Sequence, residues 1–88
     1  MRNQVYGERG IIMKQVFVKF HSMEQVKRFL NAIDRFDANF DMGSGRKVVD
    51  AKSIIGVCGL DLSEPQRLCY DSDDDRIMET LTPFLYQM

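Results

Sequence analysis

The sequence predicts a small, single-domain α+β protein in which an antiparallel sheet carries helices on one face. Two kinds of hydrophobic spacing, and the turn residues between them, support this fold class. In several short runs apolar residues alternate with polar ones, as in half-buried strands, and in others they recur every three or four residues, as in amphipathic helices. A chain of 88 residues is long enough to bury one core.

The first strand and the first helix have the clearest signals. Between residues 15 and 20, one face of a strand carries Val16, Val18 and Phe20. Ser22 and Gln25 then fit a capping box, in which each side chain accepts a backbone N–H near the helix start. The helix that follows has an apolar stripe formed by Met23, Val26, Phe29, Leu30 and Ile33. Residues 1–12 show no such periodicity, so we expect a loose extension there and a domain over residues 13–88.

The middle of the chain predicts a hairpin and a short helix. A strand over Ala38–Met42 is followed by Gly43–Gly45, whose residue types favour a hairpin turn into Arg46–Asp50. Ser53 then opens a short apolar helix over residues 54–60.

The last third predicts a strand and a helix. Pro65 bounds a fourth strand over Arg67–Asp71, and a helix begins at Ser72, with Asp73–Asp75 at its positive end. Pro83 is expected to kink or end this helix, because proline removes a backbone hydrogen bond and collides with the preceding turn. Its apolar face carries Ile77, Met78, Leu81 and Leu85. The predicted order is therefore β-α-β-β-α-β-α.

Composition and charge argue against several classes of function. The net charge of −1 lacks the basic excess typical of nucleic-acid binding, so no nucleic-acid partner is expected. No apolar run approaches the roughly 18 residues that a membrane span needs. The first ten residues are too polar for a secretory signal, so we expect a cytoplasmic protein with no membrane partner.

The residue types also argue against metal and cofactor sites. Cys58 and Cys69 form no CxxC motif and are expected to be buried or half-buried free thiols. Residues 71–75 begin like a calcium loop, but Arg76 and Thr82 occupy its glycine and glutamate positions. With one histidine and no phosphate-loop glycines, we expect no metal, no cofactor and no enzymatic activity.

The segment between Arg35 and Leu62 resembles the HPr family of histidine-containing phosphocarriers. The resemblance rests on Phe36-Asp-Ala-Asn-Phe-Asp and on Gly45-Arg-Lys-Val-Val-Asp-Ala-Lys-Ser-Ile-Ile-Gly-Val; the rest of the chain, from about residue 13, agrees in its order of elements. It implies an HPr-like open-faced sandwich of four antiparallel strands with three helices on one face. It also matches Ser53 to a regulatory serine that a dedicated kinase phosphorylates. Lys52, Ile54, Ile55 and Leu60 then match the patch that meets enzyme I, the HPr kinase and a transcriptional repressor.

The chain departs from the carrier members of this family at the catalytic motif. Counted back from Ser53 without gaps, the histidine of a Gly-Leu-His-Ala-Arg-Pro-like motif falls on Ser22, and its arginine falls on Glu24. His21, the only histidine, lies one position earlier and is a weak candidate for a phosphoryl acceptor. A glutamate at the arginine position repels a phosphoryl dianion.

These observations predict a non-catalytic regulatory or binding protein related to the sugar phosphotransferase system, similar to the catabolite-repression HPr-like proteins. Ser53 would be the switch beside the docking patch. Two alternatives stay open: a phosphoryl carrier that uses His21, and a diverged scaffold with an unrelated partner. Each candidate residue also has a purely structural interpretation, since Ser53 can be a plain N-cap and the apolar residues can be core.

Overall fold

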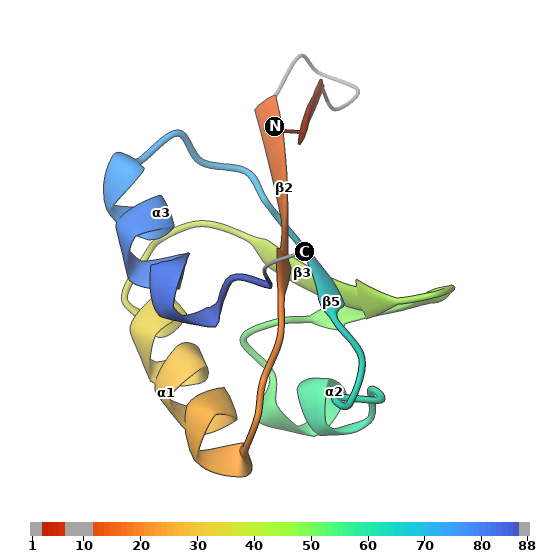
Figure 1. Ribbon diagram of the computed structural model, residues 1–88. Coiled ribbons are helices and arrows are strands. Elements are labelled where there is room, and N and C mark those ends of the chain that lie inside the picture. Colours follow the sequence, from red (N-terminus) through yellow and green to blue (C-terminus); the bar gives the residue numbers. More distant parts are fainter. Residues whose placement is uncertain (1–2, 7–11, 87–88) are drawn as a thin grey trace.

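The computed structural model describes residues 3–6 and 12–86, which form one antiparallel sheet and three α-helices (Figure 1). From the second strand onward the elements follow the predicted order β-α-β-β-α-β-α. The elements are β1 (Asn3–Tyr6), β2 (Ile12–Val18), α1 (Met23–Asp34), β3 (Phe40–Ser44), β4 (Lys47–Asp50), α2 (Ile54–Cys58), β5 (Gln66–Tyr70), α3 (Asp75–Leu81) and the 3-10 helix η1 (Thr82–Phe84).

The sheet has the strand order β1-β2-β5-β3-β4, and every neighbouring pair is antiparallel. The four predicted strands are confirmed, and β1 is a fifth strand that the sequence did not predict. It pairs with β2 from Asn3 opposite Gln15 to Tyr6 opposite Ile12, and so covers part of the edge of β2. The expected loose extension over residues 1–12 therefore differs from the structure at Asn3–Tyr6 and Ile12; residues 1–2 and 7–11 lie outside the described residues.

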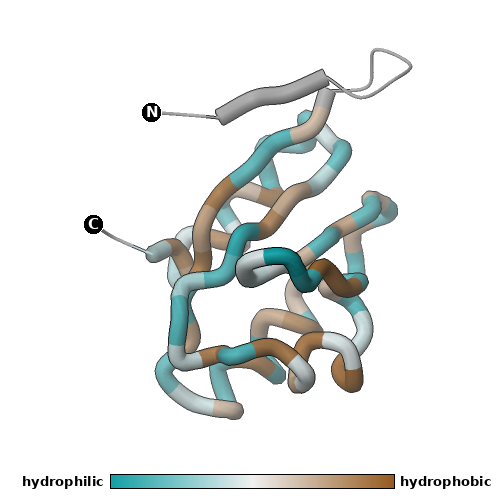
Figure 2. The backbone as a smooth tube through the Cα atoms, turned by 90° about the vertical axis from the view of Figure 1, so that its right-hand side faces the viewer, coloured by the Kyte–Doolittle hydropathy of each residue, from teal (hydrophilic) through white to brown (hydrophobic). Residues whose placement is uncertain are grey.

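One face of the sheet carries the core and the opposite face is open. Val18, Met42 and Leu68 point into the core and are fully buried, whereas Phe17 and Val48 are 41% and 57% exposed on the other face. The helices contribute buried residues to this same core: Val26, Phe29, Ile33, Val57, Ile77 and Leu81. Figure 1 shows α1 and α3 side by side against the strands. Figure 2 shows hydrophobic and hydrophilic stretches that alternate along the chain, as expected for elements with one buried side.

An aromatic cluster joins α1 to the C-terminal segment. The rings of Phe20, Phe29 and Phe84 lie 5.1 to 6.0 Å apart between centroids. Beyond the cluster the chain runs along β2, where the Tyr86 N–H donates to the Phe17 carbonyl at 2.8 Å. Pro83 ends α3, as predicted, by turning the chain into η1. Leu85 consequently lies beyond the helix, opposite Val18, instead of on the predicted helical face.

The hairpin turn begins two residues later than predicted. Gly43 and Ser44 extend β3, and the turn falls at residues 45–46, where Gly45 adopts φ 63°. Gly43 is needed for a different reason, because a Cβ atom there would lie 2.9 Å from the backbone carbonyl oxygen of Lys47 and 2.9 Å from Nη2 of Arg67. The missing side chain lets Arg67 lie across β3 on the open face.

The helix starts follow the predicted cap chemistry with two changes. Ser22 Oγ accepts from the Gln25 N–H at 3.2 Å, but Gln25 Oε1 accepts from the N–H of His21 instead of that of Ser22, at 2.7 Å. Helix α3 is capped by Asp74, whose carboxylate accepts from the Arg76 N–H at 3.0 Å. Ser72, the predicted cap, instead accepts from the Asp74 N–H at 3.1 Å and so shapes the turn before the helix.

Asn39 and Asp71 join two loops that are distant in sequence. The Asp71 carboxylate accepts from the backbone N–H and the side-chain amide of Asn39, both at 2.8 Å. The backbone hydrogen bond from Asn39 is the main cause that lowers the pKa of Asp71 below its ordinary value of 3.8.

This lowered pKa predicts an acid-dependent contribution to stability. The unfolded chain takes up the Asp71 proton at a higher pH than the folded protein, so the contribution is present above the unfolded pKa and is lost as the pH falls through the folded one. Asp71→Asn should therefore flatten the decline of the unfolding free energy between about pH 5 and pH 2, by less than about 1 kcal/mol because solvent screens this carboxylate. Urea unfolding across that range measures the slope. An unchanged slope in Asp71→Asn would contradict the expectation.

Within the described residues no helix combines the length and the apolar character required to cross a bilayer.

Candidate functional site

Ser53 is the N-cap of α2, in agreement with the structural interpretation of this residue. Its Oγ accepts from the Gly56 N–H at 3.2 Å, and its carbonyl accepts from the Val57 N–H at 2.9 Å. The preceding turn is fixed by Asp50, which accepts hydrogen bonds from the N–H groups of Lys52 and Ser53. Ser53 is half-buried, and the cap hydrogen bond holds its hydroxyl in a defined position.

The outer side of α2 is apolar and exposed. Ile54 is 44% exposed and Ile55 is 84% exposed, and Cys58 lies on the surface one turn further along. We name Ile54, Ile55 and Cys58 the α2 face. A single exposed aliphatic residue needs no explanation, but neighbouring ones on a short helix are typical of a contact surface.

Leu60 is not part of this face. The sequence placed it in the predicted docking patch, but it is only 7% exposed and packs in the core together with Val57. Leu60 lies beyond the end of α2, and its N–H donates to the Val57 carbonyl at 3.1 Å in a turn that returns the chain to the core. The exposed position of Cys58 also differs from the expected buried or half-buried thiol.

Lys52 holds the start of α2 against the end of α1. Its Nζ donates to the Phe36 carbonyl at 2.6 Å and lies 5.7 Å from the centroid of the Phe40 ring. Lys52 was predicted to contact a partner; the structure gives its ammonium group an internal partner. The side chain also borders a hollow of about 490 Å³ between the two helices, lined by Lys27, Leu30, Asn31, Asp34, Lys52 and Ile54.

A second lysine holds the other end of α2. Nζ of Lys47 donates to the Gly59 carbonyl at 2.8 Å, which satisfies a backbone group beyond the last turn of the helix. With Ser53 and Lys52 at its start and Lys47 at its end, the five-residue helix is fixed at both ends. The α2 face is therefore presented in a single orientation, which lowers the entropic cost of binding a partner.

His21 lies at a different helix start. It is exposed just before α1, and its backbone N–H is taken by Gln25 Oε1. Glu24 lies in the first turn of α1, while Nζ of Lys19 lies 3.4 Å from the Phe20 carbonyl and brings a cation to the same turn. Among the described residues no hydrogen bond or ion pair joins His21 to Ser53, so these two candidates belong to separate sites.

Cys69 lies half-buried on the open face of the sheet. Its Sγ donates to Gln15 Oε1 at 3.7 Å, and burial raises the pKa of the thiol.

The part of the chain that the structure describes holds no cluster of three or more histidine, cysteine or acidic side chains arranged to bind a metal ion.

Sequence reasoning missed two features of the surface. Met23 was assigned to the buried stripe of α1 but is 47% exposed, because it lies in the first turn where the helix extends past the core. A hollow beside Arg35, Phe36 and Arg76 was also not predicted, since it joins residues from the end of α1 and the start of α3. The only sequence feature that could have indicated this hollow is the adjacent pair Arg35 and Phe36.

No family model, curated protein or solved structure matches this chain.

Proposed function

We propose that this protein is an HPr-like, non-catalytic regulatory protein of the cytoplasmic sugar phosphotransferase system. A protein partner docks on the α2 face, and phosphorylation of Ser53 changes that docking. The partners are enzyme I, the HPr kinase or a transcriptional repressor, as the resemblance of residues 36–57 implies. The order of elements and the antiparallel sheet with helices on one face support the HPr-like assignment.

The observation that carries the proposal is the position of Ile55. It is the most exposed of the large apolar side chains among the described residues, and it lies two positions after Ser53 on a helix held at both ends. An aliphatic side chain that is preordered and exposed forms a good anchor for a partner pocket.

The same geometry supports a switch at Ser53. A phosphoryl group adds a charge of about −1.5 to −2 at neutral pH and three acceptor oxygens. At Ser53 it would stand at the border of the apolar α2 face and would require the partner to desolvate a charge. It would also convert Ser53 Oγ, which now accepts from the Gly56 N–H, into an ester oxygen that is a weaker acceptor. Docking before and after modification therefore differs through local charge and local helix geometry.

The test is phosphorylation of the purified protein, measured by intact mass. With HPr kinase and ATP we expect one phosphoryl group on the wild type and none on Ser53→Ala. Ser63→Ala, at an exposed serine in the loop after α2, is the matched control and should still be modified. A wild type without modification, or a Ser53→Ala variant that is still modified, would contradict the switch.

A parallel reaction with enzyme I and phosphoenolpyruvate tests the carrier alternative. The proposal expects no modification in that reaction, because Glu24 lies in the first turn of α1 near His21. An acid-labile phosphoryl group that His21→Ala abolishes would replace the regulatory proposal by the phosphocarrier.

A further inference from the structure

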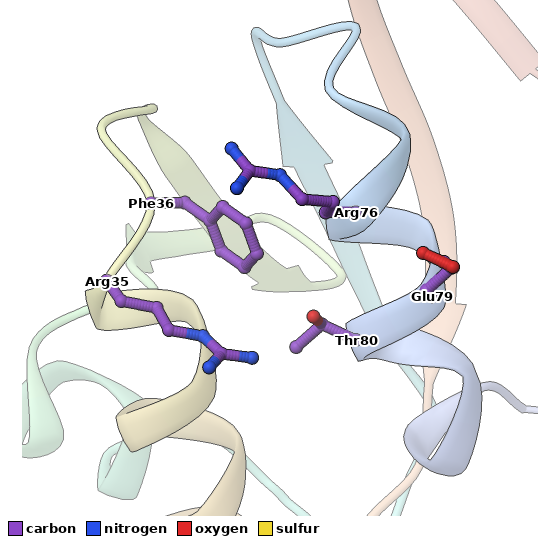
Figure 3. Close-up of a pocket in the computed structure, with 5 residues that line it drawn as sticks. All are labelled: Arg35, Phe36, Arg76, Glu79 and Thr80. Atoms are coloured by element: carbon purple, nitrogen blue, oxygen red, sulfur yellow. The ribbon is translucent and has the colours of Figure 1, made fainter.

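A hollow of about 420 Å³ lies between the C-terminal end of α1 and the first turns of α3 (Figure 3). It is lined by Arg35, Phe36, Arg76, Glu79 and Thr80. Its size is within the range of small-ligand pockets in proteins. It does not contain Ser53 or the α2 face, so it is independent of the proposed function.

Two arginines from different elements approach the same aromatic ring. The guanidinium carbon of Arg35 lies 5.6 Å from the centroid of Phe36, and that of Arg76 lies 5.9 Å from it. Phe36 is only 9% exposed, so its ring forms an apolar floor beneath the two cations. Both arginine side chains are exposed, Arg76 to 77%, so a ligand can reach their donors from solvent.

The two positive charges are not equally compensated. Arg76 is engaged by Asp74, with Nη2 at 2.7 Å and Nε at 3.1 Å from the carboxylate oxygens. Arg35 forms no ion pair and no side-chain hydrogen bond with residues 13–86, where side chains are described. One guanidinium at the hollow therefore keeps its full set of donors.

The two guanidinium groups lie on opposite sides of the Phe36 ring (Figure 3). In Figure 3 the guanidinium group of Arg35 extends toward Thr80, and that of Arg76 lies over Phe36 from the opposite helix. Glu79 also lines the hollow, on the same helix as Arg76 and Thr80. The donors that face the hollow are thus two guanidinium groups and one hydroxyl, while Asp37 and Asp74 border a neighbouring hollow that shares both arginines.

We propose that this hollow binds an oxyanion, either a phosphoryl or a carboxylate group, between Arg35 and Thr80 with Arg76 as the second cation. A guanidinium group presents parallel N–H donors that match two oxygens of such a group, which makes arginine more suitable here than lysine. Arg35 supplies the uncompensated charge and is the main contact.

The experiment is an NMR titration of the full-length ¹⁵N-labelled protein with sodium phosphate and, separately, with sodium acetate. Sodium chloride holds the ionic strength constant, because exposed charges are screened by salt. We expect saturable shifts of the Phe36, Arg76 and Thr80 amide signals. If only phosphate gives saturable shifts, the site binds a phosphoryl group. If only acetate does, the site binds a carboxylate. If both do, the site binds an oxyanion of either kind.

Two variants separate the site from general surface charge. Arg35→Gln should weaken the apparent affinity by at least about 10-fold, the effect of losing one charge-assisted contact. Arg28→Gln removes an exposed arginine from the same helix but not from the hollow, and should bind as the wild type does. Shifts that rise linearly without saturation, or equal affinities in the two variants, would overturn the proposal.

Discussion

Replacing Phe29 by alanine is expected to lower the free energy of unfolding by about 3–5 kcal/mol, the largest stability effect that we predict for this chain. Phe29 is fully buried, and its ring contacts those of Phe20 and Phe84 at centroid distances of 5.1 and 5.5 Å. Its removal leaves a cavity between α1 and the C-terminal segment. Since small domains have only about 5–15 kcal/mol in total, the variant should be close to unfolding.

Urea unfolding at low temperature measures this change, through the shift of the midpoint at constant slope. Phe29→Leu is the second variant, because it keeps most of the apolar volume and should remain folded if the alanine variant does not. Arg28→Ala, at the exposed neighbouring position, should stay within about 0.5 kcal/mol of the wild type. A loss below about 1 kcal/mol for Phe29→Ala would show that the aromatic cluster does not hold α1 to the C-terminal segment.

The largest expected effect on function is that of Ile55→Ser. Ile55 is 84% exposed, so its truncation should change the unfolding free energy by no more than about 0.5 kcal/mol. If Ile55 anchors the partner, its loss should weaken binding to purified HPr kinase by at least about 30-fold, which corresponds to about 2 kcal/mol. Isothermal titration calorimetry with each variant gives the dissociation constant.

Val48→Ser is the matched control for this experiment. Val48 is also a large exposed β-branched residue, but it lies on the open face of the sheet, on the side opposite to α2. Its truncation should leave binding unchanged. Wild-type affinity in Ile55→Ser, or an equal loss in Val48→Ser, would show that the α2 face is not the docking surface.

The sequence predicted well those features that depend on neighbouring residues. The cap at Ser22, the strand alternation at Val16 and Val18 and the end of α3 before Pro83 each depend on hydrogen bonds or sterics within a few positions. Such signals act in the same way in any fold, so they can be read without tertiary context.

The features that were missed depend on contacts between distant segments. Strand β1 has no periodicity of its own and is defined by its pairing with β2. Gly43 was assigned to the turn, but it belongs to β3 because it pairs with Val48 of β4 and with Arg67 of β5. No local pattern reports such pairings, because the partners are brought together only by the folded sheet.

For the candidate site, the sequence alone determined that a serine would cap a short apolar helix at residue 53 and that the chain would form an α+β domain. It did not determine which apolar residues of that helix are exposed to solvent. A five-residue helix has too few turns to define a buried side by its own periodicity. Only the tertiary structure decided that Val57 and Leu60 pack into the core while Ile54 and Ile55 face outward. It also decided that Lys52 and Lys47 hold the helix in place and that Arg35 and Arg76 both approach the Phe36 ring. The reason is that burial and charge pairing are set by the packing of elements that are distant in sequence.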